Sequence, residues 1–281
     1  KAQQLGMPAA INISFGNTYG AHDGTSLLER FIDDISNYWK TVICIGSGNE
    51  GVAAGHTSGK LIMGRDESVQ VAIQEQERTI NIQLWKAYYD VADISIISPS
   101  GVKVGPIQEA LGSQRFTVGG TELLLYYGEP SPYSTNQEIY IDFLPKDTYI
   151  TSGIWQIVLT PRKIVTGNYS MWLPSENVLN RGTGFLYPVE DMTITIPSTA
   201  DFSGRGENTK PDIVAPGVNV LAPSRDGGYT LVTGTSFATP FATGGAALMM
   251  EWGIVRGNDA FLYGEKVKAY MQRGARPLPG F

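Results

Sequence analysis

The strongest chemical signal in the sequence is a serine hydroxyl at the start of a predicted helix. Ser236 lies in the run GTSFATP (234–240), where small residues lead into the apolar stretch 237–252, which predicts a buried helix. The first N–H groups of a helix have no partner within it, so they stabilise negative charge that develops nearby. A serine in such a place is more often a simple N-cap, and Ser236 taken alone fits that interpretation better than the role of a nucleophile.

A second signal is an amide side chain that follows a short apolar run. Residues 41–45 (TVICI) predict a buried parallel strand, and GSGNEG (46–51) comes directly after it and contains Asn49. Taken alone, this run is better explained as an ordinary turn between a strand and a helix. The pattern gains meaning only in combination with other segments.

Four segments together resemble the subtilisin-like serine proteases, or subtilases. Residues 234–240 resemble the nucleophile motif G-T-S-x-A-T-P, and KPDIVAPGV (210–218) resembles the segment K-P-D-x-x-A-P-G. NISFG (12–16) is similar to the family's N-x-S-x-G strand, and residues 46–51 are similar to A-A-G-N-x-G. The four follow one another in the family's order, and the resemblance covers both ends of the chain but not its middle.

The resemblance implies a role for each matching residue. Ser236 would be the nucleophile, and the Asn49 amide would donate a hydrogen bond to the oxyanion. The family binds a peptide by adding it as an extra strand, so main-chain hydrogen bonds hold the substrate. The residues expected to line that groove are Ser14, Phe15, Gly16, Gly46, Ser47, Gly48, Gly234 and Thr235. The implied activity is that of a serine endopeptidase acting on protein or peptide substrates.

The other two members of a catalytic triad have no match in the chain. Subtilases carry Asp, then His, then Ser, and the resemblance puts the Asp and the His before Lys1. His22 and His56 both follow the 12–16 segment, which is the wrong order. We interpret His22 as a loop residue ahead of the helix cap and His56 as a residue that follows the oxyanion turn, and either could still line the cleft. A serine without a base is a weak nucleophile, so we expect this chain alone to be poorly active. A missing N-terminal segment, or a propeptide, is therefore an expected partner.

The elements that would position these residues predict an interrupted α/β domain. Residues 1–70 alternate strand, helix and strand, and residues 198–281 return to that style, with a strand region at 211–220. Residues 71–197 contain many short β-type runs without helices, typical of an antiparallel β-sandwich or jelly-roll. The predicted fold is a partial subtilisin-like domain with a parallel sheet, interrupted by that insert. The run 193–200 passes directly into 201–206, where relatives carry another strand and loop, so residues absent from the sequence or a deletion are expected there.

Further features narrow the resemblance to the Csp-type germination proteases of clostridia. These are GAHDGTS (20–26), the long β insert, and the tail with EWGIV (251–255) and GAR (274–276). The Csp-type proteins carry a jelly-roll within the catalytic domain. The resemblance implies a secreted or spore-associated protein.

Composition excludes several classes of function. Hydrophobic residues make up 42% and charged residues 17% of the 281 residues, which argues against disorder. A net charge of −6 gives no basic surface for nucleic acid, and no run approaches the ~18 apolar residues of a membrane span. The single cysteine, Cys44, excludes a disulfide framework and a zinc site built from several cysteines. The implied chemistry requires no cofactor; calcium could bind to loop carboxylates, but no spacing is specific for calcium or another metal.

Two other functions remain open from the sequence. The chain could be a non-catalytic peptide-binding or signalling module on a subtilase fold, that is, a pseudoprotease. The insert could also bind a glycan or a partner through Trp155, Tyr169 or Trp172, although aromatic residues on alternating strands more often belong to the core of a sandwich.

Overall fold

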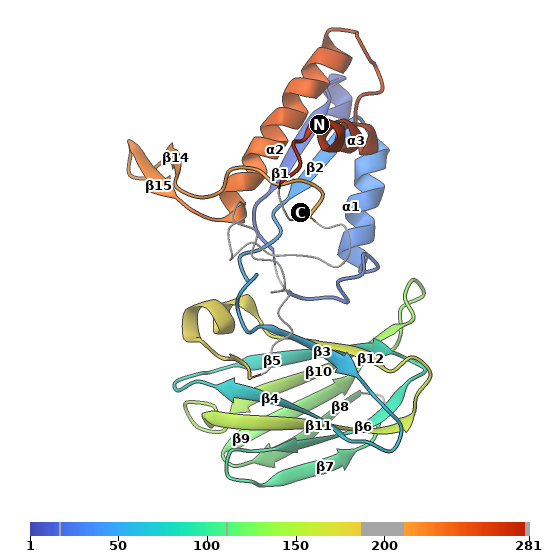
Figure 1. Cartoon of the computed structure of the whole chain (residues 1–281), viewed down its shortest axis with the longest axis vertical. Coiled ribbons are helices and arrows are strands. Elements are labelled where there is room, and N and C mark those ends of the chain that lie inside the picture. The colour runs from blue at the N-terminus through green and yellow to red at the C-terminus, as the bar shows by residue number, and fades with distance from the viewer. Residues whose placement is uncertain (17, 111, 187–210, 279–281) are drawn as a thin grey trace. The chain divides into compact units, whose positions relative to one another are not determined.

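The computed structural model describes residues 1–16, 18–110, 112–186 and 211–278 (Figure 1). The chain divides into two compact units: unit 1 comprises Lys1–Gly16, Leu27–Val52 and Asp191–Phe281, and unit 2 comprises Asn17–Ser26 and Ala53–Glu190. Apart from Asn17–Ser26, the chain enters unit 2 after residue 52 rather than at the predicted 70, because strands from 56 onward pair within unit 2. The predicted boundary at 197 and the expected break at 193–206 lie outside the described residues.

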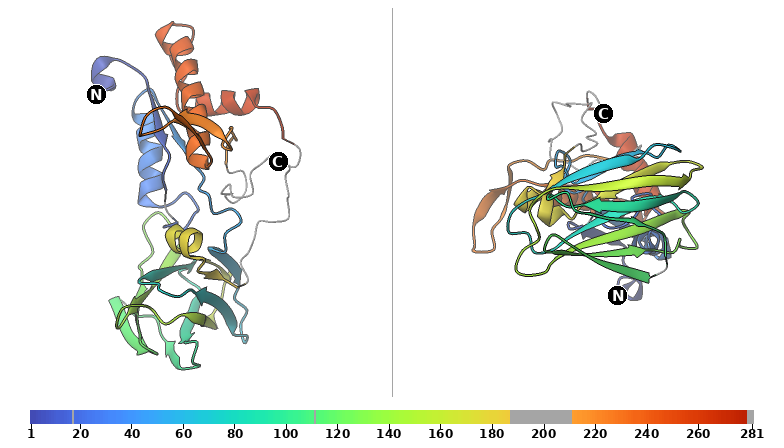
Figure 2. Two further views of the ribbon diagram at one scale, coloured as in Figure 1. Left: turned by 90° about the vertical axis from the view of Figure 1, so that its left-hand side faces the viewer. Right: turned by 90° about the horizontal axis from the view of Figure 1, so that it is seen from below.

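Unit 1 is built on a short parallel sheet. Strand β1 (Ala9–Ile13) pairs in parallel with β2 (Thr41–Ile45), and Ile11 lies opposite Ile43. Helix α1 (Leu27–Tyr38) connects the two strands, so the predicted strand–helix–strand unit is confirmed. Helix α2 (Thr235–Met250) packs on β1 and β2 from the side opposite α1 (Figures 1 and 2). The other elements of unit 1 are η1 (Gln3–Leu5), β14 (Val220–Pro223), β15 (Tyr229–Val232), η3 (Glu251–Val255) and α3 (Glu265–Gly274).

The sequence prediction for the C-terminal part of unit 1 was wrong in two respects. A strand begins only at Val220, and β14 pairs with β15 as a hairpin, so residues 211–218 are not a strand. Helix α2 is not buried all round: Ala246 and Met250 are buried, whereas Leu248 and Phe241 are exposed. The described elements that contact α2 are β1, β2, η3 and α3, which leave one apolar side of the helix uncovered.

Unit 2 contains two antiparallel sheets, as the short β-type runs predicted. The first sheet consists, in order across it, of β3 (His56–Lys60), β12 (Asn168–Trp172), β5 (Ile80–Ala87), β10 (Asn136–Pro145), β9 (Thr121–Tyr127) and β8 (Gly112–Val118). The second consists of β13 (Gly184–Phe185), β4 (Glu67–Ile73), β11 (Gly153–Lys163), β6 (Val91–Ile97) and β7 (Lys103–Ile107). A helical turn, η2 (Asn177–Arg181), precedes β13. The jelly-roll connectivity stays a prediction.

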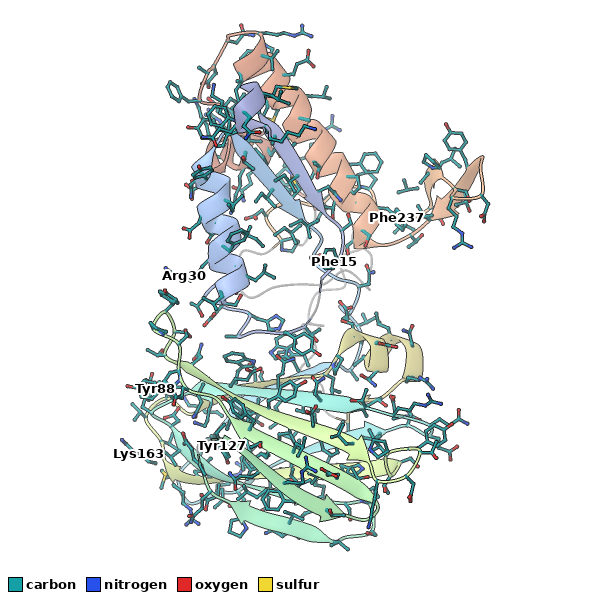
Figure 3. All side chains as sticks on the ribbon, turned by 180° about the vertical axis from the view of Figure 1, so that it is seen from behind. Phe15, Arg30, Tyr88, Tyr127, Lys163 and Phe237 are labelled. Carbon is teal, nitrogen blue, oxygen red and sulfur yellow. The ribbon has the colours of Figure 1, made fainter. Side chains whose placement is uncertain are left out.

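The two sheets of unit 2 share one hydrophobic core. Side chains of alternate residues on each strand point inward, as the burial pattern of β10 and β11 shows. Trp155 packs edge-on against Phe143, with ring centroids 5.2 Å apart, and Tyr127 lies in the same core (Figure 3). Trp155 and Tyr169 are both buried there, so neither is available to bind a glycan.

Candidate active site

A tight turn presents Ser236 in the first turn of α2. Gly234 precedes the helix with φ +150°, a conformation that residues with a Cβ rarely adopt. Its N–H donates to the Gly217 carbonyl at 2.8 Å, which ties the segment 211–218 to this turn. Ser236 is the second residue of α2, so its own N–H has no partner within the helix and remains a donor for a ligand.

Asn49 caps the start of α2 from a distant part of the chain. The Thr235 N–H donates to Asn49 Oδ1 at 2.9 Å, and the Thr235 hydroxyl lies 3.1 Å from both Oδ1 and the Gly48 carbonyl. Because a backbone N–H can only donate, the atom that faces it must be the amide oxygen. The Asn49 Nδ2 group is therefore left as a donor beside the turn that carries Ser236. Gly48, at φ +89°, allows the chain to bend at this point.

Ser14 and Ser236 exchange two hydrogen bonds across 222 residues of sequence. The Ser236 hydroxyl donates to the Ser14 carbonyl at 2.8 Å, and the Ser14 hydroxyl donates to the Ser236 carbonyl at 2.9 Å. Ser14 lies just beyond the end of β1, so these bonds join the strand to the start of the helix. The structure thus brings together Ser14, Gly48, Asn49, Thr235 and Ser236, which the sequence placed in three separate motifs.

The remaining predicted groove residues lie on both sides of this junction. Phe15 follows β1 and is 81% exposed, and Gly16 is also exposed (Figure 3). Gly46 lies against the first turn of α2, because a Cβ on it would come within 3.0 Å of Thr239 Oγ1.

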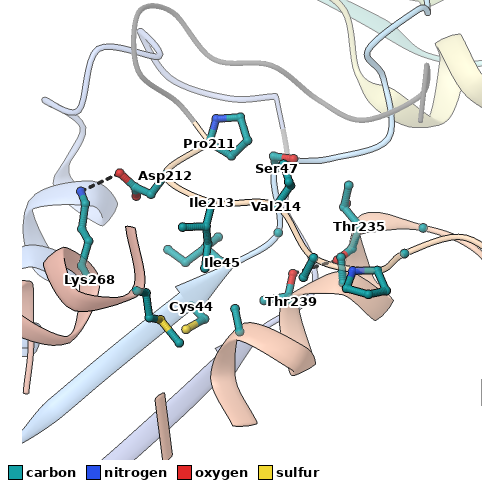
Figure 4. Close-up of a pocket in the computed structure, with 18 of the residues that line it drawn as sticks. Cys44, Ile45, Ser47, Pro211, Asp212, Ile213, Val214, Thr235, Thr239 and Lys268 are labelled. Atoms are coloured by element: carbon teal, nitrogen blue, oxygen red, sulfur yellow. Dashed lines mark hydrogen bonds and ion pairs between the residues drawn. The ribbon is translucent and has the colours of Figure 1, made fainter. Parts of the chain in front are cut away.

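A cavity of about 580 Å³ adjoins the junction on the β2 side (Figure 4). Gly46, Ser47, Gly234 and Thr235 line it, together with apolar side chains of β2 and of residues 211–218. Ser236 and Asn49 do not line it, so the cavity lies beside the candidate reactive groups and does not enclose them. An ion pair of 2.7 Å between Lys268 and Asp212 closes part of its rim.

Cys44 also lines this cavity but is a poor nucleophile. Burial raises the pKa of its thiol, and a hydrogen bond with Thr243 opposes the effect only in part. The thiol therefore stays protonated near neutral pH, whereas the thiolate is the reactive form. Ser236 is the better candidate for nucleophilic chemistry.

Comparison with known proteins gives these motifs a family. A profile of the subtilase family matches residues 8–279. The chain belongs to the subtilase family.

Individual relatives agree with this assignment. The CspB protease of Clostridium perfringens is 34% identical in sequence and has a TM-score of 0.87; the match covers 98% of this chain and 62% of that one. The predicted likeness to Csp-type subtilases is thereby confirmed. Subtilisin-like protease SBT4.10 of Arabidopsis thaliana is 38% identical over 148 residues, which are 43% of this chain and 20% of that protein. PII-type proteinase of Lactococcus lactis subsp. cremoris is 33% identical over 84 residues, or 28% of this chain and 4% of the proteinase. The subtilase chain thus spans less than two thirds of each of these relatives.

Both histidines of this subtilase chain are stacked on one tryptophan in unit 2. His22 and His56 each lie with the ring centroid 3.8 Å from that of Trp172, at interplanar angles of 13° and 17°. His22 Nε2 lies 3.0 Å from the Thr18 carbonyl, and burial lowers the pKa of His56 to about 4, with a smaller contribution from His22. With two imidazoles stacked on it, Trp172 is not an open platform for a sugar.

Metal-binding side chains do not gather in the described part of the chain. Within residues 1–16, 18–110, 112–186 and 211–278, no group of three or more His, Cys, Asp or Glu side chains could hold a metal ion. In the same ranges no helix has the length and apolar character needed to cross a membrane.

Proposed function

We propose that this chain carries the nucleophile and oxyanion hole of a subtilisin-type serine endopeptidase. The observation that carries the proposal is the bond between Thr235 N–H and Asn49 Oδ1. This bond orients the amide so that Nδ2 and the Ser236 N–H are both free to donate near the Ser236 hydroxyl. Such a pair of donors is what acyl transfer requires for a negatively charged oxygen.

In the proposed reaction, Ser236 Oγ adds to the carbonyl carbon of a peptide bond and gives its proton to a base. The Asn49 amide and the Ser236 N–H hold the oxyanion until the carbonyl re-forms and the amine leaves with that proton. Water then releases the acyl group by the same steps in reverse order. The Ser236 hydroxyl must first leave the Ser14 carbonyl, to which it donates in this structure. This sequence of steps uses no cofactor or metal.

The base and its orienting carboxylate are proposed to be a His and an Asp outside residues 1–281. This proposal is supported by the family's order of Asp, His and Ser, which puts both groups ahead of the 12–16 segment, whereas His22 and His56 follow that segment. The chain alone is then expected to be poorly active, and a segment carrying the base, or a propeptide, is its expected partner.

The substrate is proposed to be a protein or peptide bound as an extended strand. Ser14, Phe15 and Gly16 would lie along one side of it. The other residues of the groove would be Gly46, Ser47, Gly48, Gly234 and Thr235. From the likeness to Csp-type subtilases we further propose that the protein is secreted or spore-associated, acts in spore germination, and carries a jelly-roll as unit 2.

A fluorophosphonate probe tests the proposal on the intact native protein. The probe forms an Oγ–P bond with an activated serine and releases fluoride. We expect labelling of wild-type protein at Ser236, and none in Ser236→Ala, with Ser131→Ala, an exposed serine of unit 2, as the matched control. Absence of labelling in the wild type, or labelling that persists in Ser236→Ala, would overturn the proposal.

A non-catalytic peptide-binding module is the second candidate. The observation in its favour is that the Ser236 hydroxyl donates its single proton to the Ser14 carbonyl, which is not a base. This candidate predicts that the intact protein binds peptides, remains unlabelled by the probe and cleaves nothing, a combination that the first proposal forbids.

A further inference from the structure

The carbonyl of Ser236 lacks its ordinary partner in α2. In an α-helix a carbonyl accepts from the N–H four residues later, which for Ser236 is residue 240. Residue 240 is proline, which has no N–H, and its ring also crowds the carbonyl four residues before it. The polar group closest in the backbone to the nucleophile therefore needs a donor from outside the helix.

The Ser14 hydroxyl supplies that donor, at 2.9 Å from the Ser236 carbonyl. The same residue accepts the Ser236 hydroxyl on its own carbonyl at 2.8 Å. Ser236 is thus held at two points, its main chain and its side chain, by one residue at the end of β1. A displacement of Ser14 would move both.

Asn12 determines which way the Ser14 hydroxyl points. Asn12 Nδ2 lies 2.7 Å from Ser14 Oγ. Asn12 Oδ1 and the Thr239 carbonyl each lie 3.1 Å from the Thr243 hydroxyl and share its single proton. Because the amide nitrogen can only donate, Ser14 Oγ accepts there, and its single proton is left for the Ser236 carbonyl. Thr243 lies two turns along α2 from Ser236, so the chain of bonds leaves the helix, passes along β1 and returns to the helix.

We propose that Ser14, oriented by Asn12, is a positioning residue that replaces the N–H missing at Pro240 and fixes the turn that carries Ser236. The inference rests on the proposed function in that it assigns Ser236 as the nucleophile. It differs from the groove-lining role expected for Ser14, because it acts through Ser236 and not through the substrate. It also gives Pro240 a role, since the missing N–H opens the Ser236 carbonyl to Ser14.

The rate of fluorophosphonate labelling of the intact native protein separates the two roles. We expect Ser14→Ala to lower the maximal labelling rate at Ser236 about tenfold or more while the half-saturating probe concentration stays within twofold. Ser14→Thr keeps the hydroxyl and should retain most of the rate. Asn12→Asp should behave like Ser14→Ala, because a carboxylate cannot donate to Ser14 Oγ and draws its proton away from the Ser236 carbonyl. An effect confined to the half-saturating concentration would assign Ser14 to the groove and overturn the inference.

A double-mutant cycle with Pro240→Ala gives a sharper test. Alanine restores the N–H at residue 240, so the Ser14 hydroxyl becomes redundant. In that background Ser14→Ala should lower the maximal labelling rate by less than about threefold. An equal loss of labelling rate in both backgrounds would overturn the inference.

The same cycle, read by the midpoint of thermal unfolding, does not depend on activity. Ser14→Ala should lower the midpoint at least twice as far in the wild-type background as in the Pro240→Ala background, and equal shifts would overturn the inference. If the wild type is not labelled at all, the proposed function fails, and the thermal cycle still decides whether Ser14 replaces the missing N–H.

Discussion

Asn49 uses the two ends of one amide for two purposes. Its oxygen satisfies the Thr235 N–H at the start of α2, and its nitrogen lies beside Gly234, 3.6 Å from where a Cβ on that residue would be. Removing the side chain therefore takes away a cap and a proposed oxyanion donor together.

We predict that Asn49→Ala lowers the turnover number on a peptide substrate by about 10²–10³, the loss that follows removal of one oxyanion donor. Substrate affinity should change little, because the oxyanion exists only in the transition state. The measurement is kcat and KM of the intact protein, with Asn37→Ala, an exposed amide in α1, as the control. A change in KM alone would contradict the oxyanion role.

His56 makes the stability of unit 2 depend on pH. Burial lowers its pKa in the folded protein to about 4, below the ordinary value of 6.5, so the unfolded state binds a proton first as the pH falls. The contribution of the neutral His56 side chain to the free energy of unfolding should be fully present above about pH 6.5 and be lost as the pH falls from 6.5 to 4.

We predict that His56→Gln flattens this dependence of the thermal midpoint over the same range. Wild type and variant should differ in slope below pH 6.5 and run parallel above it. Parallel curves throughout would show that the imidazole of His56 does not remain neutral in the fold.

At this scale the sequence predicted which residues matter but not how they are bonded. Short motifs with fixed residue types name Ser14, Asn49 and Ser236, because a backbone turn and an amide donor need specific residues. The exchange of bonds between Ser14 and Ser236 depends on the distance between two elements 222 residues apart, which no local pattern encodes. Asn12 had a usable signal, since residues two apart on a strand share a face and can hydrogen-bond.

At the scale of elements, Gly234 before α2 and Gly244 within it have opposite requirements. Gly234 has φ +150°, and a Cβ on it would lie 3.6 Å from the Asn49 head group. Gly244 lies in the middle of the helix with nothing within 4 Å of its Cβ position.

We predict that Gly234→Ala destabilises the protein by about 1–3 kcal/mol, the cost of backbone strain, and also lowers labelling of Ser236. Gly244→Ala should stabilise by about 0.5–1 kcal/mol, because alanine loses less entropy in a helix. Urea unfolding of both variants measures the difference. A neutral Gly234→Ala would mean that this turn does not need glycine.

The elements that the sequence predicted well are those with a regular apolar pattern. The alternation in β10 reflects one buried face, so the pattern survives in the sequence. The helical spacing in α1 also predicted its helix, although no residue of α1 is buried and Leu28 and Phe31 are exposed. Strands β3, β7 and β8 fall outside the predicted β-type runs, because His56–Lys60 and Gly112–Val118 are largely polar and Lys103–Ile107 contains Gly-Pro. The exposed side of α2 could not be predicted, since an apolar residue in the sequence does not reveal what covers it.

At the scale of the whole chain, unit 2 has a hydrophobic core made only of its own residues, all from positions 61–185. We predict that residues 53–186 alone fold into both sheets and unfold in one cooperative transition. Circular dichroism during heating measures this, and a gradual loss of signal would contradict it.

The same fragment lacks His22, which covers part of Trp172 in the whole chain. Its tryptophan emission should therefore be shifted to longer wavelength than that of the whole chain with Trp39→Phe and Trp252→Phe, which has the same three tryptophans. The fragment Trp172→Phe should remove the shift, which assigns the change to this one indole.

The order of the segments along the chain has a consequence for biosynthesis. Ser14 is made early, but the hydroxyl that it holds is added 222 positions later, after all of unit 2 has been translated. A ribosome that stalls anywhere before residue 236 releases polypeptide with no reactive alcohol at this location. If Ser236 is the nucleophile, the nascent product is therefore unable to attack a peptide bond until unit 2 and the start of α2 have been translated.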